Sequence, residues 1–130
     1  MLYVSCKERS MIQYRRAITR TRIARVVREK NIDRLDAIKI DTDGNELSIL
    51  RGAKEVLREF RPVILFEIAT YLLDENQESF YEDFLKLLIP IGYKVFDSVS
   101  RRQVTDENIR QIVPPGGSVD LVAVQLDSRK

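Results

Sequence analysis

Two short apolar runs, each bounded by polar or turn-forming residues, are the clearest features of the sequence. The first, Ala-Ile-Lys-Ile at residues 37–40, ends at Asp41, and the second, Val-Ile-Leu-Phe-Glu-Ile at residues 63–68, follows Pro62. The almost wholly apolar second run is typical of a strand covered on both faces at the centre of a parallel sheet. Weaker patterns predict three further strands, at residues 2–6, 93–99 and 119–126.

Apolar residues at helical spacing occupy the stretches between these strands. A stripe of leucine, isoleucine and valine predicts one helix over residues 46–60, with Asp43 and Glu46 placed as a capping box at its start. Gly52 lies inside this helix, where we expect it to permit close helix–strand packing. Gly92 is placed to end a later helix. The remaining helices are expected at residues 23–30, 80–88 and 105–112.

This alternation of strands and helices predicts the fold class. Strands joined through single helices and short connections favour an α/β sandwich with right-handed crossovers. A chain of 130 residues is enough for one compact domain, which consists of a basic segment, residues 1–36, and a main part, residues 37–130. Ligands of such sheets bind at the carboxyl ends of the strands, so residues 41–46 and 67–71 are the first candidates for a site.

Composition narrows the chemistry that the chain can perform. The sequence has no histidine and a single cysteine, Cys6. An internal disulfide and a multi-thiolate metal site are therefore excluded, and the commonest general base is missing. We expect no metal site. Any acid–base step must use carboxylates, lysine, tyrosine or a cofactor, and Cys6 is better explained as a half-buried apolar thiol than as a nucleophile.

Charge is distributed unevenly along the chain. Residues 1–36 contain 10 basic and 4 acidic side chains, whereas residues 37–130 contain 12 and 16. The basic stretch at residues 14–30 could bind phosphate backbones, but no nucleic-acid motif accompanies it, so a nucleic-acid-binding domain is the least favoured alternative. No apolar run is long enough to cross a bilayer and no leader pattern opens the chain, so we expect a cytoplasmic protein without a membrane partner.

The acidic turn at residues 41–46, Asp-Thr-Asp-Gly-Asn-Glu, fits three chemistries to different degrees. Its first three oxygen side chains have the spacing of a calcium-binding EF-hand loop, but Glu46 and Gly52 occupy the places of the obligatory glycine and glutamate. An apolar strand running into Asp-x-Asp-Gly also resembles the first motif of haloacid-dehalogenase-type hydrolases. That match is partial, because Asn45 stands where a threonine is usual.

The third chemistry accounts for much more of the chain. Residues 38–44 read Ile-Lys-Ile-Asp-Thr-Asp-Gly and residues 46–53 read Glu-Leu-Ser-Ile-Leu-Arg-Gly-Ala, followed by Arg-Pro-Val-Ile-Leu-Phe-Glu-Ile at 61–68 and Asp-Leu-Val-Ala-Val at 120–124. In order and spacing this resembles the carboxy-terminal half of FkbM-type methyltransferases, from about Thr21 onward. Departures from the family pattern include an aspartate at position 43 where glutamate is usual.

The resemblance implies a function and a fold. FkbM-type enzymes use S-adenosylmethionine to methylate an oxygen of a small acceptor, and their fold is the Rossmann-like class I methyltransferase sandwich. Here that sandwich would be truncated to the second half of a mostly parallel sheet with an antiparallel final strand. None of the five glycines forms the glycine-rich turn that holds this cofactor, so its binding residues are unknown and binding by this chain is in doubt.

Four carboxylates are the candidate catalytic residues that the resemblance implies: Asp41, Asp43, Glu46 and Glu67. Asp41 would face the sulfonium and the acceptor, with the other three around it. Helix capping competes as an explanation for Asp43 and Glu46, and hydrogen bonding at the sheet end competes for Glu67. The alternative to an enzyme is a truncated, non-catalytic module that acts through oligomerisation.

The missing first half of the family's sheet would leave one edge of the strand at residues 37–40 without a neighbour. Such an edge invites pairing, because its backbone donors and acceptors are unsatisfied. Either residues 2–6 fold back onto it or another chain pairs with it. We favour a homodimer, with a complementing chain as the other possibility.

Overall fold

The computed structural model describes residues 2–6, 11–14, 22–41, 46–69, 80–113 and 116–125. The strands within these ranges are β1 (Leu2–Cys6), β2 (Met11–Tyr14), β3 (Leu35–Ile40), β4 (Val63–Ala69), β5 (Lys94–Asp97), β6 (Gln103–Val104) and β7 (Ser118–Val124). The helices are α1 (Arg22–Glu29), α2 (Glu46–Gly52), α3 (Lys54–Phe60), α4 (Phe80–Leu88), the 3₁₀ helix η2 (Ile89–Ile91) and α5 (Ile109–Ile112). The expected α/β class is confirmed, and no helix in these ranges is long and apolar enough to cross a membrane.

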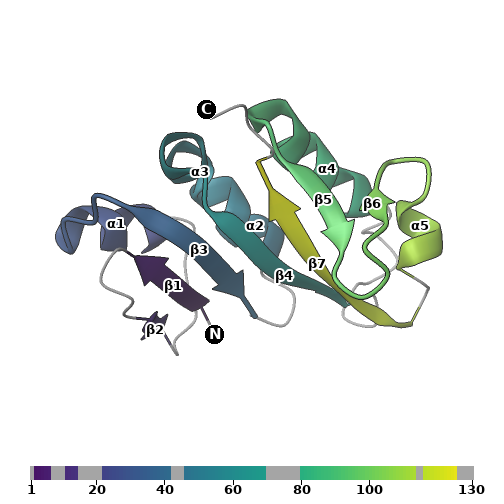
Figure 1. Cartoon of the computed structure of the whole chain (residues 1–130), viewed down its shortest axis with the longest axis horizontal. Coiled ribbons are helices and arrows are strands. Elements are labelled where there is room, and N and C mark those ends of the chain that lie inside the picture. The colour runs from purple at the N-terminus through teal and green to yellow at the C-terminus, as the bar shows by residue number, and fades with distance from the viewer. Residues whose placement is uncertain are drawn as a thin grey trace.

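The strands form one sheet in the order β2-β1-β3-β4-β7-β5-β6 (Figure 1). Among the described strands only β3 and β4 pair in parallel, and the other five pairs are antiparallel. The antiparallel final strand β7 is confirmed, but the expectation of a mostly parallel sheet is wrong. An apolar pattern shows that a strand is buried, but it does not show in which direction the neighbouring strands run.

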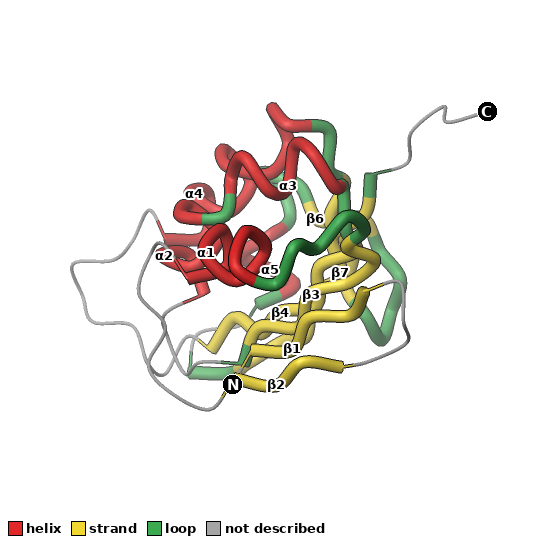
Figure 2. The backbone as a smooth tube through the Cα atoms, turned by 90° about the vertical axis from the view of Figure 1, so that its left-hand side faces the viewer, coloured by secondary structure: helices red, strands yellow, loops and turns green. Residues whose placement is uncertain are grey.

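The helices cover one face of this sheet, and in the described part of the chain the other face has no covering layer (Figure 2). Along β4, Ile64, Phe66 and Ile68 are buried under the helices, whereas Val63 and Leu65 are each 38% exposed. Successive side chains of a strand point to opposite faces, so these two residues lie on the bare face. The prediction that this strand is covered on both faces is therefore wrong, because an apolar run does not require two covering layers.

The core lies between the covered face and the helices. Ile38, Ile64 and Leu88 are fully buried, and the rings of Phe66 on β4 and Phe84 on α4 stack with centroids 5.2 Å apart. The inward residues of neighbouring strands and the apolar stripes of α2, α3 and α4 form one continuous cluster. This packing fixes where each strand ends, and it therefore fixes the position of the strand-end carboxylates.

The helix predicted over residues 46–60 is divided into α2 and α3 at Ala53. Ala53 is fully buried, and its amide donates to the carbonyls of both Ile49 and Leu50 at 3.1 Å. Gly52 is consequently the last residue of α2 and half-buried, not an interior position of one long helix. Buried residues of both short helices belong to the same core cluster.

The edge of β3 that the sequence left unpaired is covered from within the chain. β1 pairs antiparallel with β3, from Leu2 opposite Ile40 to Cys6 opposite Leu35. A further strand, β2, which the sequence pattern did not reveal, pairs with the other side of β1. The fold-back of residues 2–6 is thus the arrangement present, and a homodimer formed through the β3 edge is not needed to satisfy that strand.

A tight hairpin joins β5 to β6 and ends the strand predicted over residues 93–99 at Asp97. The carboxylate of Asp97 accepts hydrogen bonds from the Val99 amide and the Ser100 hydroxyl, both at 2.9 Å. The bond from the Val99 amide is the largest of the effects that hold the pKa of Asp97 below its ordinary value. The amide of Ser98 donates to the carbonyl of Asp120 at 3.0 Å, which fixes the turn against β7.

Candidate functional site

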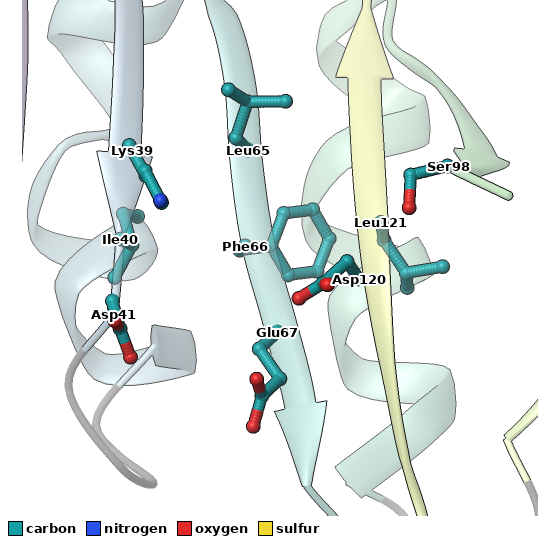
Figure 3. A pocket seen from close by; sticks show the side chains of 9 residues that line it. All are labelled: Lys39, Ile40, Asp41, Leu65, Phe66, Glu67, Ser98, Asp120 and Leu121. Atoms are coloured by element: carbon teal, nitrogen blue, oxygen red, sulfur yellow. The ribbon is translucent and has the colours of Figure 1, made fainter.

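A cavity of about 390 Å³ opens on the bare face of the sheet, where β3 and β4 end (Figure 3). β3, β4, β7 and the β5–β6 turn all contribute to it. Its lining residues are Lys39, Ile40, Asp41, Leu65, Phe66, Glu67, Ser98, Asp120 and Leu121. The cavity therefore lies at the carboxyl ends of two neighbouring strands, the region that the sequence makes the first candidate for a site.

Two of the four predicted catalytic residues line this cavity. Asp41 is exposed directly after β3, and Glu67 is half-buried near the end of β4. Figure 3 shows their carboxylates at the same end of the sheet, with the side chain of Lys39 extending from β3 toward β4. The parallel pairing of β3 with β4 brings the two acids to the same sheet edge, although their positions in the sequence are far apart.

The other two predicted residues are not among those that line the cavity. Glu46 is 4% exposed in the first turn of α2, where a carboxylate is stabilised by the positive end of the helix dipole. This position favours its explanation as a residue of the helix start. Asp43 lies outside the described residues, as do Arg15, Arg16 and Arg20 of the basic stretch.

The structure adds residues that the sequence analysis did not select: Lys39, Ser98 and Asp120. Asp120 is the direct cross-strand partner of Glu67, and both side chains face the cavity. Only the pairing of β4 with β7 reveals this relation. In the sequence, the one sign of Asp120 was a polar residue at an outward position of an otherwise apolar strand.

The pairing of Glu67 with Asp120 has an energetic cost. In general, like charges directly opposite each other on one face of a sheet are destabilising, although Glu67 also has an interaction of its own. Asp41 lies on the same margin, which makes the cavity rich in negative charge, with Lys39 as the cation among its lining residues. Such an arrangement suits a ligand that has, or develops, positive charge.

No group of three or more His, Cys, Asp or Glu side chains that could hold a metal ion occurs in the ranges that the structure describes. Three acids, Asp41, Glu67 and Asp120, line the cavity. Without any histidine in the sequence, they are also the candidates for accepting a proton there.

This chain is thus a two-layer α/β protein with an acidic cavity at its strand ends. Comparison with known families narrows this class to one family. The model of the methyltransferase FkbM domain matches residues 8–95, more than half of the chain. The chain belongs to the FkbM methyltransferase domain family. No curated protein and no solved structure gives a significant match.

S-adenosylmethionine, the cofactor that the family implies, fits this site in part. Its reactive end is a sulfonium cation, which suits the carboxylates of Asp41, Glu67 and Asp120. Its other end is an adenosine group. Gly92 and Gly116, the glycines with a positive φ in the described ranges, do not line the cavity, so neither provides a close backbone approach to adenosine there.

Proposed function

We propose that this chain forms the methyl-transfer end of an FkbM-type methyltransferase. The reaction is transfer of a methyl group from S-adenosylmethionine to an oxygen of a small acceptor. One observation supports this most directly: Asp41, which belongs to the strand motif of the family, lines the same cavity as Glu67 on the neighbouring parallel strand. The family match at residues 8–95 supports the class of reaction.

The side chains of the cavity have distinct roles in this proposal. The cofactor supplies an electrophilic methyl group next to a positive sulfur. Asp41, exposed at the end of β3, faces that positive charge and stabilises it. Glu67, half-buried near the end of β4, accepts the proton of the acceptor hydroxyl, because a positioned carboxylate can act as a general base. Glu46 is not among the lining residues and Asp43 lies outside the described residues, so neither is given a step in this proposal.

The isolated chain should bind S-adenosylmethionine weakly or not at all, because none of its five glycines forms the glycine-rich turn that cradles this cofactor. Calorimetric titration of the purified chain measures this directly. We expect no binding in the micromolar range. A dissociation constant near 1 μM would require about −8 kcal/mol of binding free energy and would show that this chain has an adenosine site of its own.

Replacement of Asp41 by asparagine tests the catalytic role, either in this chain complexed with a complementing half or at the matching position of a full-length family member. The isostere keeps the shape and removes the charge. We expect turnover to fall at least tenfold, about 1.4 kcal/mol in transition-state stabilisation, while the unfolding midpoint stays within experimental error.

Glu59→Gln is the matched control, since Glu59 is an exposed acid of α3 outside the cavity. It should leave turnover unchanged. Equal rates for Asp41→Asn and the parent would instead make Asp41 a structural residue.

The second candidate function is a non-catalytic module that acts through association with another chain. The bare face of the sheet favours it, since a one-sided sheet with apolar residues on its open side has surface left to bury. A cofactor titration of the chain together with a complementing half separates the two candidates, because a non-catalytic module has no affinity for S-adenosylmethionine even when its partner is present.

A further inference from the structure

The bare face of the sheet is apolar at its centre. The strand register places Leu65 of β4 beside Val122 of β7, and Val122 beside Phe96 of β5. Val63 and Leu65 are each 38% exposed, and Val122 and Phe96 are partly exposed. We define the open-face patch by these four residues and two neighbours on the same face, Ala37 and Val124. Antiparallel sheets that face water normally place polar residues at such positions, so this patch is suited to a partner.

Charged residues border the patch unequally. Asp41, Glu67 and Asp120 lie at the margin where β3 and β4 end. Lys39, opposite Leu65 in the register, lines the same cavity as these acids, one row from Glu67, and Lys94, opposite Val124, lies farther from them. A partner that complements this face therefore needs an apolar centre and basic side chains toward one end.

A second copy of the chain meets this requirement poorly. Two copies could stack face to face about a twofold axis that is parallel to the strands. In that arrangement the acidic margin of one copy lies against the acidic margin of the other. The twofold axis could instead cross the strands, along the row of register partners from Lys39 to Phe96. Lys39 of one copy would then lie against Lys39 of the other. Both arrangements place like charges together in a buried interface, which is costly.

We propose that the open-face patch binds an amphipathic helix of another polypeptide, with its apolar stripe on the patch and basic residues over the acidic margin. Helices cover the opposite face of the same sheet, and a helix is the usual covering layer of an α/β sheet. The exposed part of β4 spans roughly 13 Å, so a helix of about ten residues covers it. This surface goes beyond the proposed methyl transfer, although the docked helix forms a wall over the cavity.

Two synthetic 18-residue helical peptides test the charge preference. They share one leucine and alanine stripe, and their polar positions are all lysine in one and all glutamate in the other. We expect the lysine peptide to bind the chain at least tenfold more tightly, measured by fluorescence anisotropy. Equal affinity for the two peptides would contradict the proposed charge complementarity.

The location of binding is tested with a ¹⁵N-labelled chain. A spin label on the lysine peptide should broaden the amide signals of Leu65, Val122 and Phe96 and spare those of α3 and α4. Leu65→Lys should weaken binding at least tenfold, and Ile89→Lys, which adds the same charge at a 51% exposed apolar position outside the patch, should not.

The spin-label measurement uses the unmodified chain, so it decides the location even if Leu65→Lys does not fold. Broadening confined to the helices would overturn the proposal. A dimer detected by light scattering that Leu65→Lys abolishes would assign the patch to a second copy instead. Neither result bears on cofactor binding, which the calorimetric titration measures independently.

Discussion

Tyr93 shows how much a single buried hydroxyl contributes to this fold. The residue is 2% exposed, and its hydroxyl donates to the carbonyl of Pro62 at 2.7 Å. Pro62 directly precedes β4, so this bond ties the start of the central strand to the start of β5. Burial is the main cause that raises the pKa of Tyr93 above its ordinary value of 10.0, with smaller opposing effects of Gln125 and Arg61.

Tyr93→Phe should reduce the free energy of unfolding by about 1–2 kcal/mol at about pH 8, because the buried Pro62 carbonyl loses its donor. The parent should also lose stability as the pH rises above 10, since the unfolded chain can ionise Tyr93 and the folded chain resists this ionisation. Urea unfolding at about pH 8 and about pH 11 measures both effects. The gap between parent and variant should narrow at the higher pH, and a constant gap would contradict the burial effect.

Residue patterns in the sequence located part of the site and missed part of it for a physical reason. Asp41 and Glu67 could be predicted, because each ends or nearly ends an apolar run. Asp120 and Ser98 could not, because their relation to Glu67 arises only from the pairing of β7 with β4 and from the turn after β5. The capping explanation of Glu46 was also available from the sequence, and its buried position at the start of α2 favours it.

Among the structural elements, the turn at Gly92 depends on backbone freedom. Gly92 has a φ of +100°, and its amide donates to the carbonyl of Ile89 at 3.0 Å to end η2. An added Cβ would lie 3.5 Å from the side-chain oxygen of Gln125, which is an ordinary contact. The glycine is therefore required for its backbone conformation and not for space, and its predicted role as a helix terminator is confirmed.

Gly92→Ala should lower the free energy of unfolding by about 1 kcal/mol through the left-handed backbone alone. Gly52→Ala is the comparison, because Gly52 lies in a helix without a positive φ. We expect that change to be neutral or slightly stabilising in thermal unfolding. Marked destabilisation by Gly52→Ala would show that the close packing inferred for Gly52 from the sequence is real.

Most helices and strands could be predicted from the sequence, whereas the relative directions of the strands and the position of the helix break could not. Strands at residues 63–68 and 119–126 and the helix at residues 80–88 were evident from apolar periodicity. The division of residues 46–60 at Ala53 was not, because a helical stripe continues through the break without a change of pattern. β2 and β6 are short edge strands, for which an apolar period is hardly defined.

At the scale of the whole molecule, β1 is the strand that makes β3 an interior strand. It covers the edge of β3 over most of its length. Without it, the backbone donors and acceptors of an apolar strand would face solvent, which promotes pairing between chains. A homodimer remains a prediction for the intact chain, but the reason first given for it applies only when β1 is absent.

Deletion of residues 1–14 should therefore cause self-association. We expect the shortened chain to form dimers or larger species at micromolar concentration in light scattering, more than the intact chain does. Placing a proline in β3, at Lys39, in the shortened chain should reduce this association, because a proline in an edge strand disfavours pairing with a further strand. A monomeric shortened chain would show that β3 does not need an edge partner.

The position of β7 constrains the order in which the sheet can be completed on the ribosome. β7 follows every other described element along the chain, yet it lies in the sheet between β4 and β5. Until it leaves the exit tunnel, β4 lacks one neighbour, and the β5–β6 hairpin has no strand to connect it to the rest of the sheet. The nascent protein therefore exposes the apolar edge of its central strand from the time β4 emerges until β7 follows it, and a chaperone that shields extended segments would act during that interval.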